Sequence, residues 1–430
     1  MRLRRLFICF FFLVSIQVFC QPKYYNEVLK KLTSNKMQGR GYTKNGMEKA
    51  SNYLAKEFEK LGMKSFENNY FQSFTFPINI IHSAKISING NSLRYGKDFI
   101  IKPSSVSVNN SNVTEYHTFP VDDYIASFQS KEKIKKFIEN DSESQKGKHI
   151  ILPPMINSID SINQYYKQWA NIYEKDINTN RAIFRFTKDS LTSSLSQRQA
   201  EISEFIIKDK YYSENLEIDK YSIQSEFQPN FKFNNVIGYI DGENNDSVVV
   251  ISAHYDHLGR VGKSIFPGAS DNASGTAMVL ELAKFYSKNK PKYKTVFMLF
   301  GAEEAGIVGA FKYVNQPFFP LSSIKFLVNL DIMGAGDEGI QVVNGTKYRE
   351  QFDELVKINA EKNFLKQVKI RGESCNSDHC AFDQKGVPSF FIYTLGGKGN
   401  YHNIYDTYEN LDLSNAENVK KLLLKFINSL

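Results

Sequence analysis

The stretch VVVISAHYD, residues 248–256, opens with four β-branched apolar residues and closes on a histidine and an aspartate. An apolar run of this kind is typical of a strand that is buried on both faces of a parallel sheet. Three later runs share the pattern, at Val296–Phe300, Ile324–Leu330 and Pro388–Tyr393. Helical patterns occur at Ser274–Tyr286, Ala305–Tyr313, Phe352–Lys362 and Asn415–Ile427. This alternation predicts an α/β fold with a mixed, largely parallel central sheet flanked by helices.

The region before this alternating part has a different texture. Residues 43–62 carry apolar side chains at helical spacing, and residues 71–91 alternate like strands. Residues 95–228 are rich in Ser, Asn and Lys and contain short strand-like pieces such as Lys148–Leu152. We therefore expect a mainly β domain over residues 95–228, inserted into a main domain that comprises residues 21–94 and 229–430.

The start of the chain has the three parts of an export signal. An apolar run, Leu6–Val14, follows a basic beginning, and Val18 and Cys20 place small side chains ahead of a cleavage point. The run is too short to cross a bilayer, which takes about 20 apolar residues, and no later segment is long and apolar enough. We expect residues 1–20 to be a signal peptide and the protein to be exported, to the periplasm or outside the cell. Lipid attachment at Cys20 fits less well, because Phe19 is bulky where a small residue is needed.

The composition excludes several classes of protein. Among 430 residues, 42% are hydrophobic and 23% charged, which is a globular balance rather than that of a disordered chain, a collagen or a coiled coil. The net charge of +8 is spread thinly, which argues against a nucleic-acid partner. Outside the leader only Cys375 and Cys380 remain, five positions apart, as a disulfide or as two free thiols. Their spacing does not favour a thiolate zinc site.

Seven histidine and carboxylate side chains follow the expected strands. They are His254, Asp256, Asp271, Glu303, Glu304, Asp331 and His402. The carboxyl ends of parallel strands meet at one edge of the sheet, where ligands bind. Carboxylates gathered there would repel one another unless cations lie between them. Imidazole with carboxylate suits zinc, and so many ligands favour two ions bridged by one carboxylate, with a spare carboxylate as general base. The pattern therefore indicates metal-assisted hydrolysis.

The ordered set of motifs resembles peptidase family M28, the co-catalytic zinc aminopeptidases. The main matching pieces are His254-x-Asp256, Ser270-Asp271-Asn272-Ala273-Ser274-Gly275, Glu303-Glu304, Asn329-Leu330-Asp331 and Tyr401-His402. Supporting pieces are Gly39-Arg40, Asn235-Val236-Ile237-Gly238, Ser377-Asp378-His379 and Asp406-Thr407. The likeness covers about residues 32–62 and most of residues 234–411, and it implies a zinc-exopeptidase-like fold. Residues 95–228 match the protease-associated domain of many relatives only loosely.

The resemblance also implies roles for the seven residues. Two Zn²⁺ ions per chain would be held by His254 and Asp331 on one side and by Glu304 and His402 on the other, with Asp271 between them. Glu303 would be the general base that takes a proton from a water bridging the two ions. Asp256 would orient His254. The substrates would be peptides, cut at the N-terminus because the free α-amine sits at one metal.

Other interpretations of these residues stay open. Asp271 could cap a helix, and Glu303 and Glu304 could complement a helix dipole. His257 is expected to be structural, and Asp378 with His379 to line or support the substrate pocket. We expect the loops Gly334–Glu338 and Cys375–Phe382 to build that pocket.

Other functions compete with the aminopeptidase. On a similar fold, a carboxypeptidase or a single-zinc glutaminyl cyclase would use comparable residues. A binding module that keeps zinc only for stability is the alternative outside enzymes. The oligomeric state is left open by the sequence.

Overall fold

The computed structural model describes residues 22–111, 148–154 and 182–430, together with individual residues between 113 and 140. The expected signal peptide, residues 1–20, lies outside the described residues. Within the described part of the chain, no helix is long and apolar enough to cross a membrane.

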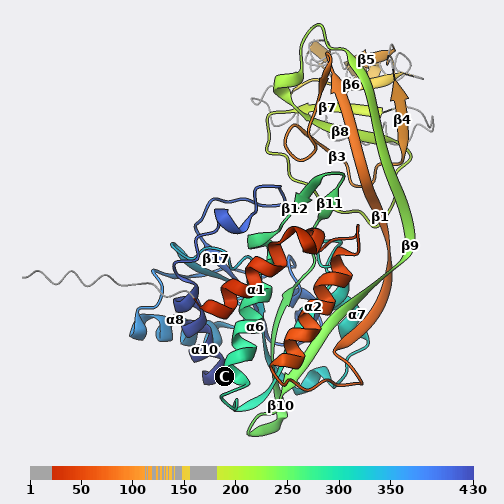
Figure 1. Cartoon of the computed structure of the whole chain (residues 1–430). Helices are drawn as coiled ribbons and strands as arrows, with labels where there is room; N and C mark the ends of the chain where they lie inside the picture. The colour runs from red at the N-terminus through yellow and green to blue at the C-terminus, as the bar shows by residue number, and fades with distance from the viewer. Residues whose placement is uncertain are drawn as a thin grey trace, which may run out of the picture.

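The main sheet has the strand order β16-β15-β17-β14-β10-β13-β9-β1-β2, with β4 on β9 (Figure 1). Its four central strands run parallel to one another: β13 (Tyr293–Phe300), β10 (Asn244–His254), β14 (Ile324–Leu330) and β17 (Ser389–Leu395). They coincide with the four apolar runs of the sequence. Antiparallel neighbours close both sides, β9 (Ile218–Ile240) against β13 and β15 (Gly339–Val343) against β17. The outer strands are β16 (Val368–Ile370), β1 (Phe71–Ile88), β2 (Asn91–Ser92) and β4 (Val108–Ser111). The predicted mixed α/β sheet is confirmed.

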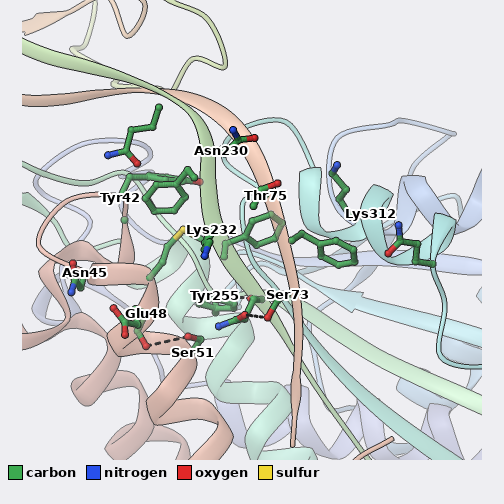
Figure 2. Close-up of a pocket in the computed structure, with 18 residues that line it drawn as sticks. Tyr42, Asn45, Glu48, Ser51, Ser73, Thr75, Asn230, Lys232, Tyr255 and Lys312 are labelled. Atoms are coloured by element: carbon green, nitrogen blue, oxygen red, sulfur yellow. Dashed lines mark hydrogen bonds between the residues drawn. The ribbon is translucent and has the colours of Figure 1, made fainter. Parts of the chain in front are cut away.

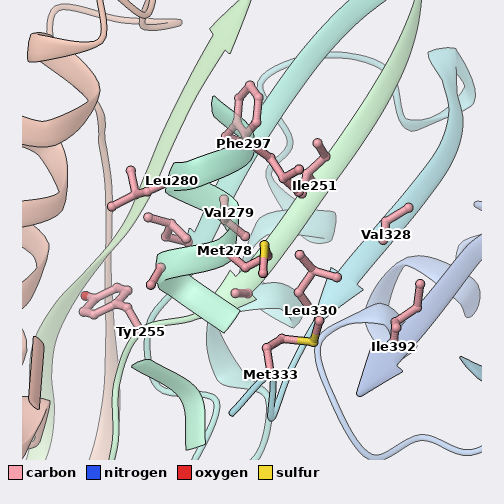
Figure 3. Packing of buried hydrophobic residues seen from close by; sticks show 14 of the residues in the cluster. Ile251, Tyr255, Met278, Val279, Leu280, Phe297, Val328, Leu330, Met333 and Ile392 are labelled. Atoms are coloured by element: carbon pink, nitrogen blue, oxygen red, sulfur yellow. The ribbon is translucent and has the colours of Figure 1, made fainter. Parts of the chain in front are cut away.

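Helices cover both faces of this sheet, as the continuous apolar strands require. Along β10, Val249 and Ile251 belong to one core cluster while Val248 and Val250 belong to another. The first cluster is completed by α1 (Lys23–Thr33), α2 (Gly46–Lys60), α6 (Gly275–Tyr286), α8 (Arg349–Lys362) and α10 (Ala416–Ser429). The second is completed by α7 (Val308–Asn315) and α9 (His379–Asp383). Figure 3 shows α6 packed on the strands at Ile251 and Val328. This two-sided burial holds the carboxyl ends of β10, β13 and β14 in fixed positions.

Two local features differ from the sequence-based expectation. Helix α1 was not predicted, although its Tyr25 and Leu29 are fully buried against the core. Helix α7 begins at Val308 rather than at Ala305, because Gly306 and Ile307 adopt the left-handed φ values of 110° and 59°. These residues form a turn after β13, and their backbone conformation is incompatible with a right-handed helix that starts at Ala305.

A second, five-stranded sheet lies away from the first, in the order β3-β8-β7-β6-β5. Its strands are β3 (Phe99–Ile101), β8 (Ser203–Lys208), β7 (Ala182–Thr187), β6 (His149–Leu152) and β5 (Tyr116–Thr118). The long antiparallel ribbon of β1 and β9 runs from the main sheet to this second sheet (Figure 1). Strand β9 continues through residue 228, where we expected a domain boundary, and contributes Tyr221 to one core and Val236 to the other. The division of the chain into two domains stays a prediction.

Cys375 and Cys380 form a disulfide, with their Cα atoms 4.9 Å apart. Of the two alternatives left open by the sequence, the structure has the cross-link.

Candidate metal centre

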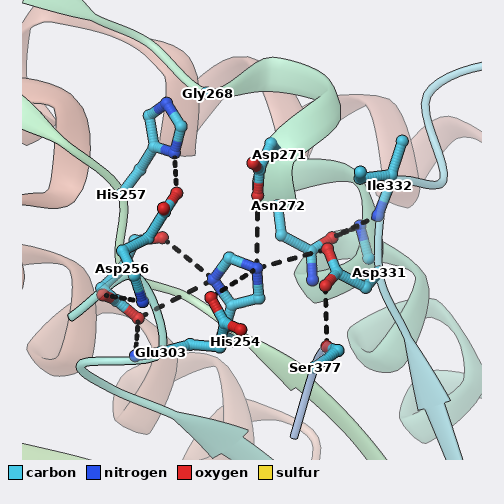
Figure 4. Close-up of polar contacts among 12 residues, drawn as sticks. His254, Asp256, His257, Gly268, Asp271, Asn272, Glu303, Asp331, Ile332 and Ser377 are labelled. Atoms are coloured by element: carbon cyan, nitrogen blue, oxygen red, sulfur yellow. Dashed lines mark hydrogen bonds and ion pairs between the residues drawn. The ribbon is translucent and has the colours of Figure 1, made fainter. Parts of the chain in front are cut away.

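The loops that follow the central strands carry the seven predicted side chains to one edge of the main sheet. His254 is the last residue of β10, Glu303 and Glu304 follow β13, and Asp331 follows β14. Asp271 precedes α6 in a loop that Asn272 fastens to β14, since its amide nitrogen donates to the Leu330 carbonyl oxygen at 2.9 Å. Figure 4 shows the contacts around His254. All seven are linked by contacts with one another, as the paragraphs below describe.

The first group of candidate ligands surrounds His254, which is 1% exposed. Its Nε2 lies 3.2 Å from Asp271 Oδ1 and 3.2 Å from Asp331 Oδ1. Its Nδ1 lies 3.2 Å from the backbone oxygen of Asp256, to which it can donate. With the ring hydrogen on Nδ1, the lone pair of Nε2 faces two carboxylate oxygens. A metal ion between the three atoms, or a proton on Nε2, makes that arrangement favourable.

The second group repeats this geometry around His402. Its Nε2 lies 3.1 Å from Asp271 Oδ2 and 2.9 Å from Glu304 Oε2, while Nδ1 lies 3.0 Å from the Ser193 backbone oxygen. Asp271 thus presents one oxygen to each histidine. His257, Asp271 and Glu304 also bring one ligand atom each within 4.8 Å of one another. A carboxylate shared between two groups is the arrangement that a pair of cations needs.

The charges of the cluster shift the pKa values of its members in the direction that favours positive charge at the two histidines. Burial alone would lower the pKa of His402, but Glu304 and Asp271 raise it to about 10. Burial would likewise lower the pKa of His254, yet Asp331 and Glu303 raise it well above its ordinary range. Burial would raise the pKa of Glu304, and His257 and His402 instead hold it at about 2. Without metal, imidazolium protons therefore occupy the places of cations, and a metal has to displace them.

Glu303 differs from the ligand carboxylates. Burial raises its pKa well above the usual range, and although His254 opposes this effect, Asp378 and Asp331 add to it. Its Oε2 lies 3.8 Å from His254 Nε2, and it belongs to neither candidate ligand group. A carboxylate beside a metal site, outside the ligand set and with an elevated pKa, has the properties of a general base.

Asp256 makes more contacts with its own surroundings than with His254. Its carboxylate accepts the backbone N–H of Glu303 at 3.0 Å, that of Glu304 at 3.3 Å and the hydroxyl of Tyr42 at 3.0 Å. The distance from its Oδ1 to His254 Nδ1 is 3.7 Å. The side chain thus fixes the Glu303–Glu304 turn, while its backbone oxygen orients the imidazole.

Three supporting residues were visible in the sequence only as unassigned matches. The fully buried Arg40 donates to carbonyl oxygens in the loops that carry His254 and Asp271, at Tyr255, Pro267 and Gly268. Asp406 accepts the backbone N–H groups of Ser270 and Asp271 at 2.8 and 3.0 Å. Ser377 donates to Asp331 Oδ2 at 2.8 Å. Such outer partners fix the positions of metal ligands.

His257, which we expected to be structural, contacts the second group directly. Its Nδ1 lies 2.5 Å from Glu304 Oε1, and its buried Nε2 has no hydrogen-bond partner among the described residues. Asp378 and His379 are both buried, and neither belongs to a candidate ligand group in the described part of the chain. His379 Nε2 donates to the Ser374 carbonyl oxygen at 2.9 Å, which joins the two ends of the loop closed by the Cys375–Cys380 disulfide.

Two cavities lie near the centre. One of about 300 Å³ is lined by Asp271, Ile332 and Tyr401 together with the loop after β17. Of the two loops expected to build a substrate pocket, residues 334–338 contribute Gly334 and Ala335, and residues 375–382 contribute nothing. A larger one of about 1000 Å³ lies between α2 and the β1–β9 ribbon (Figure 2). None of the seven predicted residues lines it, but Tyr42, whose hydroxyl binds Asp256, does.

Comparison with known proteins gives relatives that match part of this chain. Leucine aminopeptidase 1 of Sclerotinia sclerotiorum is 28% identical over 47% of this chain and 56% of its own length. Aminopeptidase YwaD of Bacillus subtilis is 32% identical over 36% of this chain and 34% of its own length. The chain therefore spans about half or less of the length of these curated relatives.

The solved structure of BSAP, a zinc aminopeptidase from Bacillus subtilis, has the same fold. It superposes with a TM-score of 0.66 over 95% of this chain and 94% of that chain, at 18% identity. The sequence model of peptidase family M28 matches residues 235–427, which include every one of the seven clustered side chains. The resemblance inferred from the order of the motifs is thereby confirmed: residues 235–427 of this chain match the model of peptidase family M28.

Proposed function

We propose that this protein is a zinc-dependent aminopeptidase that removes N-terminal residues from peptides. One observation carries the proposal: His254 and His402 each direct Nε2 at two carboxylates, and Asp271 is common to both groups. The family match and the relatives named aminopeptidases support the same activity.

The residues present fit two zinc ions. His254 and Asp331 would hold one ion, His402 and Glu304 the other, and Asp271 both; imidazole and carboxylate are the ligands that zinc takes in catalytic sites. When bound, such a pair of ions supplies an acidified water and polarises a carbonyl group. In both histidines Nδ1 donates to a backbone oxygen, so Nε2 is the nitrogen left to bind.

Glu303 would move the protons of the reaction. Its carboxylate stands outside the ligand groups and beside His254, and its raised pKa makes it a stronger base than an ordinary glutamate. We propose that it accepts a proton from the attacking water and passes it to the departing amine. Asp256 would keep it in place, because the Asp256 carboxylate holds the Glu303 backbone N–H at 3.0 Å.

The 300 Å³ cavity beside Asp271 would receive the side chain of the substrate's first residue. Ile332, Ala335, Leu395 and Leu411 give it an apolar wall, with Tyr401 at its edge. Burial of an apolar side chain there would contribute binding energy in proportion to the area removed from water.

Export is a further part of the proposal. The leader pattern of residues 1–20 supports it, and the Cys375–Cys380 disulfide suits an oxidising compartment. N-terminal sequencing of protein recovered outside the cytoplasm should begin at Gln21; an unprocessed Met1 terminus would contradict export by this signal.

The central experiment combines metal analysis with Glu303→Gln. We expect two zinc ions per native chain, and a variant that keeps both while its hydrolysis of an aminoacyl amide falls by about 10²–10⁴-fold. Glu361→Gln, which changes an exposed glutamate of α8, is the matched control and should retain native activity. A Glu303→Gln variant with undiminished turnover would refute the assignment of the base.

A panel of substrates tests the position of cleavage. Peptides with a free N-terminus and a blocked C-terminus should be hydrolysed, whereas N-acetylated peptides should not. Cleavage of N-acetylated peptides with a free C-terminus would instead identify a carboxypeptidase. Cyclisation of N-terminal glutamine without hydrolysis would identify a glutaminyl cyclase, and zinc binding without any turnover would leave a binding module.

A further inference from the structure

The segment Leu191–Gln197 belongs to the region that connects β7 to β8 of the second sheet, yet it lies against the metal centre. Ser193 and Leu195 line a small cavity together with Leu258, which follows the His254-x-Asp256 motif by two residues. Leu195 also packs against the cores of both sheets. The connection therefore leaves the second sheet, contacts the centre and returns.

The first contact is with the candidate ligand His402. Ser193 N donates to the His402 carbonyl oxygen at 2.9 Å, and His402 Nδ1 donates to the Ser193 carbonyl oxygen at 3.0 Å. His402 has a φ of 50°, a left-handed conformation that costs a residue other than glycine about 1 kcal/mol or more. The loop before it contains Gly396, Gly397 and Gly399, all with positive φ. Among the described residues, the partners of the His402 ring nitrogen Nδ1 and of its carbonyl oxygen come from Ser193.

The second contact is with the turn that carries Glu303 and Glu304. Gln197 Nε2 donates to the carbonyl oxygen of Ala305, the next residue, at 2.7 Å. This is the turn whose left-handed residues delay the start of α7. The same short segment therefore contacts the loops of two candidate ligands of one metal position, His402 and Glu304.

The segment is itself held in place from both sheets. Asn79 of β1 donates its backbone N–H to the Ser196 carbonyl oxygen at 2.8 Å, and Gln199 Nε2 donates to Asn79 Oδ1 at 2.9 Å. Ala200 N donates to the Ser104 carbonyl oxygen at 2.7 Å. A segment fastened on both sides can transmit a fixed position to the residues that it contacts.

We propose that Leu191–Gln197 is a positioning element of the metal centre, which orients His402 through the backbone of Ser193 and the Glu303–Glu304 turn through Gln197. The inference rests on the proposed zinc site and adds that the second metal position depends on the inserted region. Loss of these contacts should weaken one zinc ion selectively, because His254 and Asp331 have other partners. A merely structural role would weaken both ions alike.

Ser193→Pro tests the backbone contact, since proline has no N–H to donate to His402. Ser193→Ala is the matched control, because it keeps both backbone groups. Competition with a chromophoric chelator should show that Ser193→Pro lowers the affinity for one of two zinc ions by about 10-fold or more, the usual effect of losing an outer partner. Ser193→Ala should bind both as the native protein does. Equal weakening of both ions in Ser193→Pro, or no weakening, would overturn the proposal.

Gln197→Ala removes the second contact, with the exposed neighbour Arg198→Ala as control. One hydrogen bond of ordinary strength corresponds to about a fivefold loss of affinity for the same zinc ion. A loss for the other ion instead would contradict the assignment of Gln197 to the Glu304 side.

Hydrogen exchange of the metal-free protein separates this inference from the zinc proposal. Peptides covering residues 396–406 should exchange faster in Ser193→Pro than in Ser193→Ala, whether or not the native protein binds zinc. Unchanged exchange would overturn the positioning role by itself. Native protein that binds no zinc, with faster exchange in Ser193→Pro, would refute the proposed function and leave the contact intact.

Discussion

Replacement of Arg40 should reveal how much of the fold's stability depends on one buried side chain. Its guanidinium is 0% exposed and donates to five carbonyl oxygens. Three of these bonds, to Tyr255, Pro267 and Gly268, measure 2.8, 2.6 and 2.7 Å. A hydrogen bond to a charged group contributes about 1.5 kcal/mol or more, so Arg40→Met should lower the free energy of unfolding by at least about 4 kcal/mol. Methionine fills much of the volume, which keeps a cavity from dominating the result.

Urea unfolding of the metal-free protein is the assay, because bound metal would add its own stabilisation. Arg40→Lys should recover part of the loss, since an ammonium group has three donors. Arg349→Met is the control: that side chain is 65% exposed, pairs with Asp353 and lies over the Phe352 ring at the surface, so a change within about 0.5 kcal/mol is expected. A loss below about 1 kcal/mol in Arg40→Met would refute the reasoning, because the carbonyl oxygens would then have found other donors.

Four further predictions concern the centre and the stability of the fold. Zinc has to displace the proton on His402, whose pKa burial would lower but Glu304 raises to about 10. The zinc affinity should therefore rise about tenfold per pH unit, up to a pH of about 10. Isothermal titration at several pH values would measure this rise, and a flat profile would contradict it. The ion pair of His402 with Glu304 should stabilise the metal-free protein fully below about pH 6.5 and progressively less as the pH rises to about 10. The melting temperature of the metal-free protein should therefore fall over that range. Replacing both Cys375 and Cys380 by serine should lower the free energy of unfolding by about 2 kcal/mol, because closing so short a loop removes that much entropy from the unfolded chain. Urea unfolding, compared with the oxidised native protein, would measure the loss. An unchanged midpoint would show that the cross-link does not stabilise the fold. Tyr42→Phe removes a buried hydroxyl that donates to Asp256 at 3.0 Å and should lower the free energy of unfolding by about 1.5–3 kcal/mol in the same assay. A loss under about 0.5 kcal/mol, the size of changes at exposed positions, would exclude a structural role for this bond.

The sequence by itself determined the architecture around the centre. Each apolar run, such as Val248–Ile251, is buried on both faces in the structure, and the residues at its carboxyl end lie at one edge of the sheet. Periodicity and composition are local properties, so they predict which segments become buried strands and where each one ends. The sequence alone therefore predicts that these seven residues lie together.

Only the tertiary structure decided which groups hold those residues in place. Four of the five carbonyl oxygens that accept from Arg40, and the Ser193 backbone groups that contact His402, lie more than 200 positions away from these residues along the chain. Every residue but proline offers the same backbone groups, so no side-chain pattern marks the ones that will be used. The contact of His257 with Glu304 could not be predicted from the sequence either, because the direction of a side chain after a strand depends on how the following loops pack. The sequence specifies the candidate ligands through their chemistry, and the fold specifies their geometry through contacts that carry no sequence signature.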